Sequence, residues 1–239
     1  MKCVNVNKKI LIVAIVILCV FAVFSFTMVS NAEEVTVVGT WDISKDNGTS
    51  KVTATLYSDG RFVISGTGEM KDFSGDNRPY GDYKKSIKTV EIQNGVTSIG
   101  MYAFYECTNL TSIEIPSSVA SIGFDAFGSC TSLTSIEIQS GVTSIGEWAF
   151  KYCTSLTSIE IPNSVTSIGS HAFYKCTSLT SVEISSSLTN IEIPSNVTSI
   201  GDYAFNECTS LTSIEIPSNV TSIGDYAFNE CTSLTSIEI

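Results

Sequence analysis

Residues 96–118 read VTSIGMYAFYECTNLTSIEIPSS, and this unit of 23 residues decides the fold. Near-copies of the unit begin at Val119, Val142, Val165, Val197 and Val220. Before it, residues 87–92 (IKTVEI) match the second half of a unit in the same register. A fixed period of this length predicts a solenoid in which each repeat forms one coil and buries its apolar side chains against its neighbours.

Apolar and polar residues alternate in the LxxIxI segment of each unit. In the first complete unit, alternation places Ile113 and Ile115 on the inner side and Ser112 and Glu114 on the outer side. We therefore expect one short parallel strand per coil, paired with the same segment one coil away. The VTSIG segment predicts a second and shorter extended piece.

The GxxAFxxC segment connects these two extended pieces in each unit. It is too short for a regular helix and predicts a single helical turn. Gly100 and its counterparts are expected to form a sharp corner with positive φ. Phe104 and its counterparts are expected to stack as one column in the core.

Eight cysteines would ordinarily suggest disulfides in a secreted chain. Two of them fall near the N-terminus, and six occupy one repeated position: Cys107, Cys130, Cys153, Cys176, Cys208 and Cys231. Neighbours in such a column are close enough for a disulfide, but their Cβ vectors run parallel, and a bridge needs a crossed geometry. We expect buried free thiols, with disulfides as the alternative.

The N-terminal segment has the order of a secretory signal. Lysines at residues 2, 8 and 9 precede an apolar stretch from Ile10 to about Val29, and Ser30-Asn31-Ala32 offers a small-residue cleavage site. Residues 1–32 are therefore expected to be a signal peptide cleaved after Ala32. The apolar stretch is long enough that an uncleaved membrane anchor is the alternative.

Residues 33–86 differ from the repeats. Residues 35–42 and 50–57 alternate as strands do, and Asp59-Gly60 separates residues 50–57 from Arg61-Phe62-Val63-Ile64, which predicts a hairpin. We interpret 33–86 as a β-rich N-terminal cap. The expected fold is thus a mainly β leucine-rich-repeat solenoid at residues 87–239, with short helical turns, behind this cap.

One unit is damaged: the starts at Val165 and Val197 are 32 residues apart, and residues 188–196 form a truncated unit of nine. We expect these residues to bulge outward, with 179–184 kept in the strand ladder. The last strand, residues 234–239, has no following unit to cover Leu234 and Ile237. This predicts either a piece of a longer chain or end-to-end self-association.

The charge of the chain restricts its partners. Residues 1–32 contain three lysines and no acid, so the remainder has 10 basic and 24 acidic side chains and a net charge of −14. Such a surface repels nucleic acid and anionic membranes. Nucleic acid is not an expected partner, and membrane contact is expected only through an uncleaved N-terminal segment.

Motifs for chemistry were not found in the repeats. The single histidine, His171, holds a variable turn position, and neither a phosphate-binding loop nor HExxH occurs. Calcium-binding nonapeptides and EF-hand loops do not occur either. The sequence predicts a protein that is not an enzyme and implies no cofactor or metal.

Two surface columns are candidates for binding. The first is the outward pair on successive strands: Ser112 and Glu114, Ser135 and Glu137, Ser158 and Glu160, Ser181 and Glu183, and Ser213 and Glu215. This column is either a solubilising face or a binding face for a basic or cation-bridged partner, because solenoids often bind ligands on such surfaces. The second is the aromatic turn-side series Tyr102, Trp148, Tyr203 and Tyr226, which predicts packing over a neighbouring turn or, alternatively, stacking on a sugar. An ice-binding surface is a remote third, because Thr111 and Ser112 are neighbours and face opposite ways.

The chain resembles the BspA-like leucine-rich-repeat family of bacterial and protist surface proteins. The resemblance rests on the repeated VTSIGxxAFxxCTSLTSIEIPSS unit and on the lead-in ISGTGEMKDF (64–73) and IKTVEIQNGVTSIG (87–100). It implies a cell-surface protein involved in adhesion to host proteins or other cells. We expect binding to extracellular proteins or other cells through the concave strand face, because solenoids often bind ligands there. No catalytic residues belong to the repeat of this family.

Overall fold

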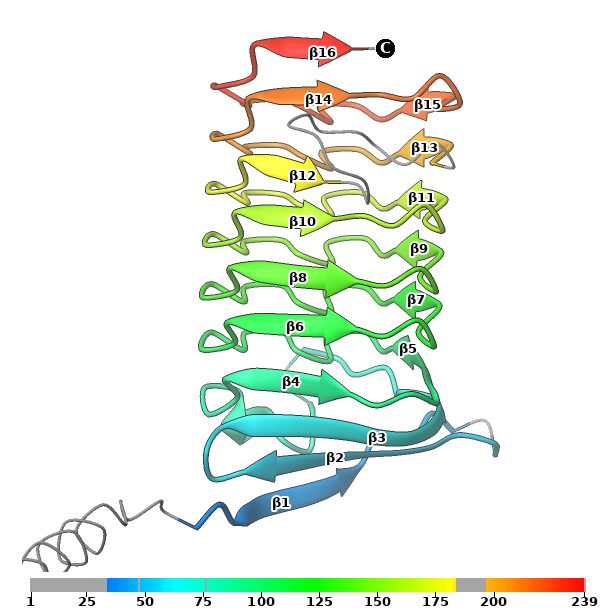
Figure 1. The fold of residues 1–239 in the computed structure, drawn as a ribbon, viewed down its shortest axis with the longest axis vertical. Helices are drawn as coiled ribbons and strands as arrows, with labels where there is room; N and C mark the ends of the chain where they lie inside the picture. Colours follow the sequence, from blue (N-terminus) through cyan, green and yellow to red (C-terminus); the bar gives the residue numbers. More distant parts are fainter. Residues whose placement is uncertain (1–33, 47, 76, 184–196, 239) are drawn as a thin grey trace, which may run out of the picture. The chain divides into compact units, whose positions relative to one another are not determined.

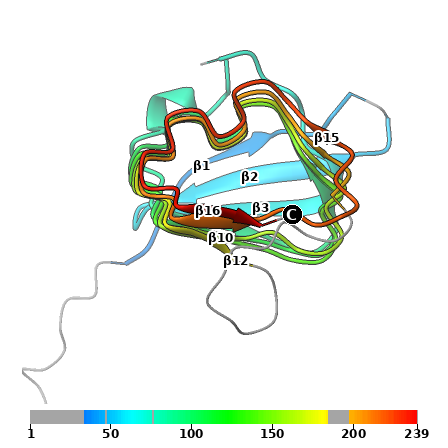
Figure 2. The ribbon, with the colours of Figure 1, turned by 90° about the horizontal axis from the view of Figure 1, so that it is seen from above.

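A computed structural model describes residues 34–46, 48–75, 77–183 and 197–238. Residue contacts divide the chain into two units, Met1–Val35 and Thr36–Ile239. All strands of the described residues lie in the second unit. Within it, short strands are stacked coil upon coil (Figure 1), and the coils overlie one another when viewed along the stack (Figure 2). The predicted solenoid of short parallel strands is confirmed.

Each coil contributes one strand to each of two parallel ladders. The first ladder contains the IEI segments: β4 (Thr89–Ile92), β6 (Ser112–Ile115), β8 (Ser135–Ile138), β10 (Ser158–Glu160) and β12 (Ser181–Glu183). The second contains the shorter pieces: β5 (Val96–Ile99), β7 (Ser121–Ile122), β9 (Ser144–Ile145), β11 (Ser167–Ile168), β13 (Ser199–Ile200) and β15 (Ser222–Ile223). Like residues pair with like, as in Ser112↔Ser135 and Glu114↔Glu137. Equivalent side chains of successive coils therefore form columns along the stack.

The burial pattern follows the predicted alternation. In β6, Ile113 and Ile115 are buried while Ser112 and Glu114 are exposed, and β8 repeats the pattern. The phenylalanines form the expected column, because the rings of Phe104, Phe127, Phe150, Phe173, Phe205 and Phe228 stack with centroids 5.1–5.5 Å apart. The core is therefore a set of self-packing columns.

The GxxAFxxC segment does not form the expected helical turn. Every second backbone N–H donates across to the next coil, as from Tyr102 to Phe124 O (3.0 Å) and from Phe104 to Ala126 O (2.7 Å). The intervening N–H groups close tight turns, as from Tyr105 to Tyr102 O (3.1 Å). Since half of the donors are used between coils, an i→i−4 helical pattern cannot form. Successive turns replace the helix.

The expected positive φ at the repeated glycines is wrong. The left-handed residues are instead two non-glycine positions per coil, such as Tyr102 (φ 56°) and Glu106 (φ 55°). Glycine is required for another reason: a Cβ on Gly146 would lie 2.6 Å from Ile122 O and 2.8 Å from Gly123 C of the preceding coil. The glycine column therefore lets the backbones of adjacent coils approach closely.

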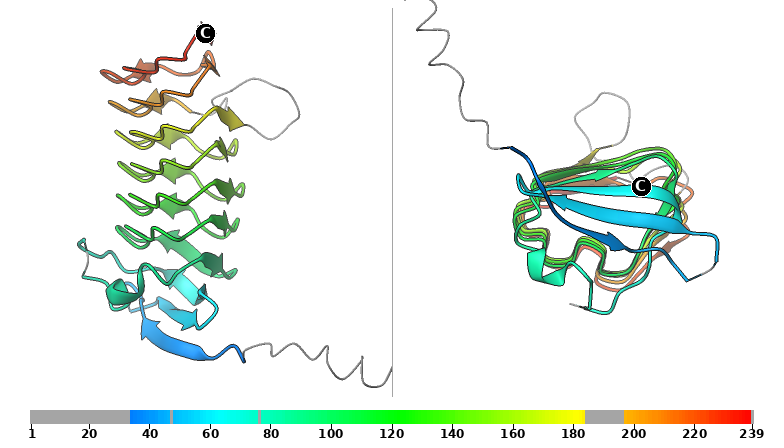
Figure 3. Two further views of the ribbon diagram at one scale, coloured as in Figure 1. Left: turned by 90° about the vertical axis from the view of Figure 1, so that its left-hand side faces the viewer. Right: turned by 90° about the horizontal axis from the view of Figure 1, so that it is seen from below.

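The N-terminal strands cover the first coil, as Figure 3 shows from below. β1 (Val37–Asp42) pairs antiparallel with β2 (Lys51–Tyr57), which pairs antiparallel with β3 (Arg61–Glu69), so the predicted hairpin is confirmed. β3 pairs in parallel with both β4 and β5 and so begins the two ladders. Phe62 of β3 contacts Phe104 edge-on, with ring centroids 6.3 Å apart. The phenylalanine column is thereby closed at its N-terminal end.

Other aromatic residues pack around this closure. The ring of Tyr80 lies 4.8 Å from that of Phe62, and its hydroxyl donates to Ala103 O (2.9 Å). The short 3-10 helix η1 (Gly81–Tyr83) follows directly. This segment fastens the start of the repeats to the N-terminal strands.

Residues 179–184 were expected to stay in the strand ladder. β12 pairs with β10 in register, Glu160↔Glu183, which confirms this for Ser181–Glu183, and residue 184 lies outside the described residues. The truncated unit 188–196 lies outside the described residues, so the outward bulge stays a prediction. Beyond it, β13 pairs with β11, so the flanking coils stack. On the strand face, however, β14 (Ser213–Glu215) pairs with β16 (Ser236–Glu238) in a separate two-stranded sheet.

The last described coil is more exposed than those before it: Ile223 and Ile237 are each 46% exposed. Among the described residues, no helix has the length and apolar character needed to cross a membrane. Residues 1–32 lie outside the described part, so signal cleavage stays a prediction.

Candidate functional site: the Ser/Glu strand face

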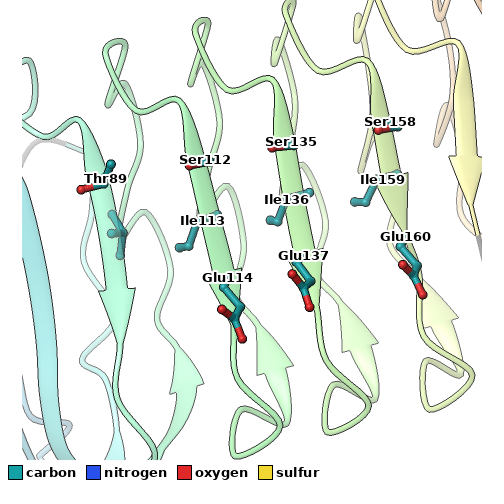
Figure 4. A pocket seen from close by; sticks show the side chains of 11 residues that line it. Thr89, Ser112, Ile113, Glu114, Ser135, Ile136, Glu137, Ser158, Ile159 and Glu160 are labelled. Carbon is teal, nitrogen blue, oxygen red and sulfur yellow. The ribbon is translucent and has the colours of Figure 1, made fainter. Parts of the chain in front are cut away.

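The strand ladder places the predicted serines and glutamates in two parallel rows, the Ser row and the Glu row. Ser112, Ser135 and Ser158 are in register, as are Glu114, Glu137 and Glu160, across β6, β8 and β10. The two rows lie two residues apart along each strand, and their side chains point from the same face of the sheet (Figure 4). The predicted residues of these three coils are thus brought together.

The remaining predicted residues are placed differently. Ser181 and Glu183 continue the backbone register on β12, and their side chains lie outside the described part. Ser213 and Glu215 belong to the separate β14–β16 sheet, so they do not continue the ladder of β4–β12. The structure therefore does not form one continuous face from all ten predicted residues.

A shallow depression of about 520 Å³ lies on the strand face (Figure 4). It is lined by the Ser row, the Glu row and the intervening residues Ile113, Ile136 and Ile159, together with Thr89 and Val90 of β4. Its base is the sheet itself, and its polar rim consists of hydroxyls and carboxylates. Such a surface suits an elongated partner that lies across several coils.

Sequence reasoning missed the first member of each row. Thr89 and Glu91 of β4 are exposed and pair with Ser112 and Glu114. The signal is present in the sequence, because IKTVEI matches the second half of a repeat and its register adds one residue to each row. The described Glu row therefore runs over four coils, from Glu91 to Glu160.

The carboxylates of the Glu row are largely free of internal partners. Glu114 accepts a hydrogen bond from Nε2 of Gln139. In the described part of the chain, the side-chain carboxylates of Glu137 and Glu160 take part in none of the hydrogen bonds or ion pairs that the structure defines. Their negative charge is therefore available to a cationic partner.

From residue 96 onward, the cations lie on the opposite, turn side. Residues 96–239 contain 14 acids and only Lys151 and Lys175. The ammonium of Lys151 lies 3.7 Å from Asp125 and 3.7 Å above the Trp148 ring, and that of Lys175 lies 3.3 Å from Glu207. Neither lysine neutralises the strand face.

The aromatic turn-side column, the alternative site, is closed by its own packing. His171 is stacked between Trp148 and Tyr203, with ring centroids 4.8 and 4.7 Å away, and Tyr203 is stacked on Tyr226 at 5.0 Å. Burial lowers the pKa of His171, and Glu147 and Asp202 oppose the shift. Stacking thus occupies the ring faces between Trp148 and Tyr226, although Tyr226 itself is 59% exposed. This supports the packing interpretation of the column.

The six repeat cysteines are present as free thiols, and five of them are buried. From Cys130 onward, each Sγ donates to the carbonyl of a phenylalanine in the preceding coil, as from Cys153 to Phe127 O (3.2 Å). Burial raises the pKa of Cys107 to about 12 and raises the pKa values of its counterparts as well. Since a thiolate is the reactive form, these cysteines are poor nucleophiles and metal ligands.

Within the described ranges, no group of three or more His, Cys, Asp or Glu side chains is arranged to hold a metal ion. The exposed threonines next to the Ser row are also engaged, because Thr134 and Thr157 donate their hydroxyls to the preceding coil. These hydroxyls do not form the free, flat array that an ice-binding face requires.

The comparisons with known structures identify the same architecture. A leucine-rich repeat protein from Bacteroides ovatus is 27% identical with a TM-score of 0.63, covering 88% of this chain and 53% of that one. The T. pallidum leucine-rich repeat protein is 29% identical with a TM-score of 0.57, covering 76% and 87%. One from Eubacterium ventriosum is 26% identical with a TM-score of 0.51, covering 84% and 72%.

None of the curated proteins compared with the chain matches it. The family model for the BspA type leucine rich repeat region matches six copies, over residues 80–192 and 185–239. These copies include every strand of the Ser/Glu face. The chain is therefore a member of the BspA-type leucine-rich repeat family.

Proposed function

We propose that this protein is an extracellular binding module that attaches to other proteins or cell surfaces through the Ser and Glu rows of its strand face, without catalysis. The observation that carries the proposal is the depression of about 520 Å³ lined by both rows over three successive coils. A partner spanning several coils makes the same weak contact repeatedly, and repeated contacts add multivalently. An exposed ion pair contributes about 0.2–1 kcal/mol, so four or five are needed for useful affinity.

The expected location is the cell surface or the extracellular medium. This rests on the family and on the basic, apolar and small-residue order of residues 2–32. An extracellular partner with a basic, extended segment would complement the net charge of −12 carried by residues 96–239.

The test is a comparison of two variants with equal charge changes. The first carries Glu114→Gln, Glu137→Gln and Glu160→Gln on the strand face. The matched control carries Glu147→Gln, Asp225→Asn and Glu230→Gln, which are exposed residues outside it. Binding to immobilised basic extracellular proteins is measured by biolayer interferometry at about 0.05 and 0.3 M salt.

We expect the strand-face variant to lose most of the salt-sensitive binding and the control to keep it. Equal losses in the two variants would mean that net charge alone attracts the partner. Unchanged binding in the strand-face variant would place the site elsewhere.

A further inference from the structure

The proposed function does not specify the backbone conformation of the partner. The spacing of the carboxylates along the Glu row restricts that conformation. Neighbouring strands of a sheet are about 4.8 Å apart, so successive carboxylates of the Glu row repeat at about that distance. Glu91 and Glu137 are therefore about 9.6 Å apart, as are Glu114 and Glu160, by the same strand spacing. The row thus offers two interleaved sets of carboxylates, which we call the odd set (Glu91, Glu137) and the even set (Glu114, Glu160).

A chain lying along the stack must present its cations at one of these spacings. In a polyproline II helix every third residue lies on the same side, and three residues advance about 9.3 Å. An extended strand presents every second residue after about 6.7 Å, which matches neither about 4.8 nor about 9.6 Å. An α-helix returns to the same face after one turn, about 5.4 Å, and after seven residues, about 10.5 Å. It therefore overshoots the spacings of about 4.8 and 9.6 Å by about 0.6 and 0.9 Å at each repeat.

We propose, on the basis of the proposed function above, that the strand face binds a basic polyproline II segment that runs along the coil stack and carries Lys or Arg at every third residue. Each cation contacts one carboxylate of the odd or the even set, skipping one coil between contacts. Each set of the described row offers two carboxylates, and long lysine and arginine side chains absorb the mismatch of about 0.3 Å between them. Hydrogen bonds from the Ser row supply the further contacts that useful affinity requires.

The Ser row completes the match. A polyproline II chain has no internal backbone hydrogen bonds, so its carbonyl groups are free to accept from a surface. The hydroxyls of Ser112, Ser135 and Ser158 lie two residues along the strand from the carboxylates and beside the same depression. They are placed to donate to those carbonyls while the cations contact the Glu row. The preformed, stiff chain loses little conformational freedom on binding.

The first experiment varies only the spacing of the cations. Three fluorescent peptides with five lysines each carry Lys at every second, every third or every fourth position, with proline at all the others. Their binding to the protein is measured by fluorescence anisotropy at about 0.05 M salt. We expect the every-third peptide to bind about tenfold more tightly than the other two.

The second experiment removes equal charge from the Glu row in two patterns. Glu114→Gln with Glu160→Gln deletes the even set and leaves the odd set intact. Glu137→Gln with Glu160→Gln leaves only the adjacent Glu91 and Glu114 of the described row, which a three-residue period cannot bridge. For the every-third peptide we expect a loss of about two- to threefold in the first variant and about tenfold in the second. Circular dichroism confirms that both variants are folded.

The outcomes separate this inference from the proposed function. Affinity that rises with charge density, so that the every-second peptide binds best, would overturn the polyproline II inference and leave the acidic binding face intact. Equal losses in the two double variants would overturn it as well. Absence of binding by all three peptides would overturn both this inference and the basic partner of the proposed function.

Discussion

The strand face and the turn side belong to the same coils and share a backbone that is hydrogen-bonded from coil to coil, but their side chains are used differently. On the turn side, phenylalanine, cysteine and aromatic columns pack on themselves, and both repeat lysines are paired with acids. On the strand face, Ser and Glu columns project into a depression. The turn side therefore supplies cohesion, and the strand face is the surface on which we propose recognition.

The region around the truncated unit shows the same division. Across it, the turn side stays hydrogen-bonded from coil to coil, as from Phe173 to Ala204 O (2.8 Å), and β11 still pairs with β13. On the strand face, β12 and β14 belong to different sheets in the described part of the chain. The stack tolerates irregularity on its strand side because the turn side holds the coils together.

Disruption of the turn side should have the largest effect. Gly146→Ala introduces a Cβ within 2.6–2.9 Å of backbone atoms of the preceding coil, so adjacent coils must separate. We expect a loss of about 3 kcal/mol in the free energy of unfolding. Urea denaturation of the variant measures the loss, and Ser140→Ala, a change at an exposed position six residues earlier, is the control. A loss below about 1 kcal/mol, within the range of an ordinary substitution, would show that the glycine column is not needed for close stacking.

The thiol column should make stability depend on pH in the alkaline range. Burial raises the pKa of Cys153 and its counterparts above the unfolded value of about 8.5. The unfolded chain therefore loses thiol protons at a pH where the folded chain keeps them. The resulting stabilisation is complete below about pH 8.5 and is lost as the pH rises toward the folded pKa, which for Cys107 is about 12.

Each thiol should contribute about 1.4 kcal/mol of lost stability per pH unit in this window. Urea denaturation between pH 7.5 and 10.5 measures the slope, and Cys153→Ala should reduce it by the share of one thiol. This difference isolates cysteine from the lysines and tyrosines that titrate nearby. Identical slopes in the two proteins would mean that Cys153 ionises in the folded state.

The sequence predicted the two sides unequally well. Alternation in LxxIxI placed Ser112, Ile113 and Glu114 correctly, because a side chain on a strand has only two directions to point. The left-handed turn residues could not be predicted from the sequence. Tyr102 and Trp148 occupy equivalent positions and both have positive φ, although neither is a glycine. Hydrogen bonds from the N–H groups of these residues to carbonyls of the next coil hold that conformation. A local rule that assigns positive φ to glycine therefore points to the wrong position.

The extent of the candidate site was also only partly predictable. The repeat itself identified the Ser and Glu columns, and register alone would have added Thr89 and Glu91. The separation of Ser213 and Glu215 from the main ladder depends on how the backbone passes the truncated unit. The number of repeats does not predict this separation, because a repeat count treats every coil as equivalent.

Neutralising one carboxylate of the strand face should have the smallest effect on the free energy of unfolding. The effect should be a gain, opposite in sign to the loss expected from Gly146→Ala on the turn side. Glu137 lies between Glu114 and Glu160 in the ladder, and two carboxylates about 5 Å apart in water repel each other by about 0.8 kcal/mol before screening. Glu137→Gln should therefore raise the free energy of unfolding slightly, by less than about 1 kcal/mol at low salt. The gain should shrink as salt rises from about 0.02 to 0.5 M, because screening removes the same repulsion in the unsubstituted protein. Ser135→Ala, a change in the same strand without charge, should show no such salt dependence in parallel urea denaturation. A loss of stability in Glu137→Gln would instead assign the carboxylate a structural contact, and the strand face would then share the cohesive role of the turn side.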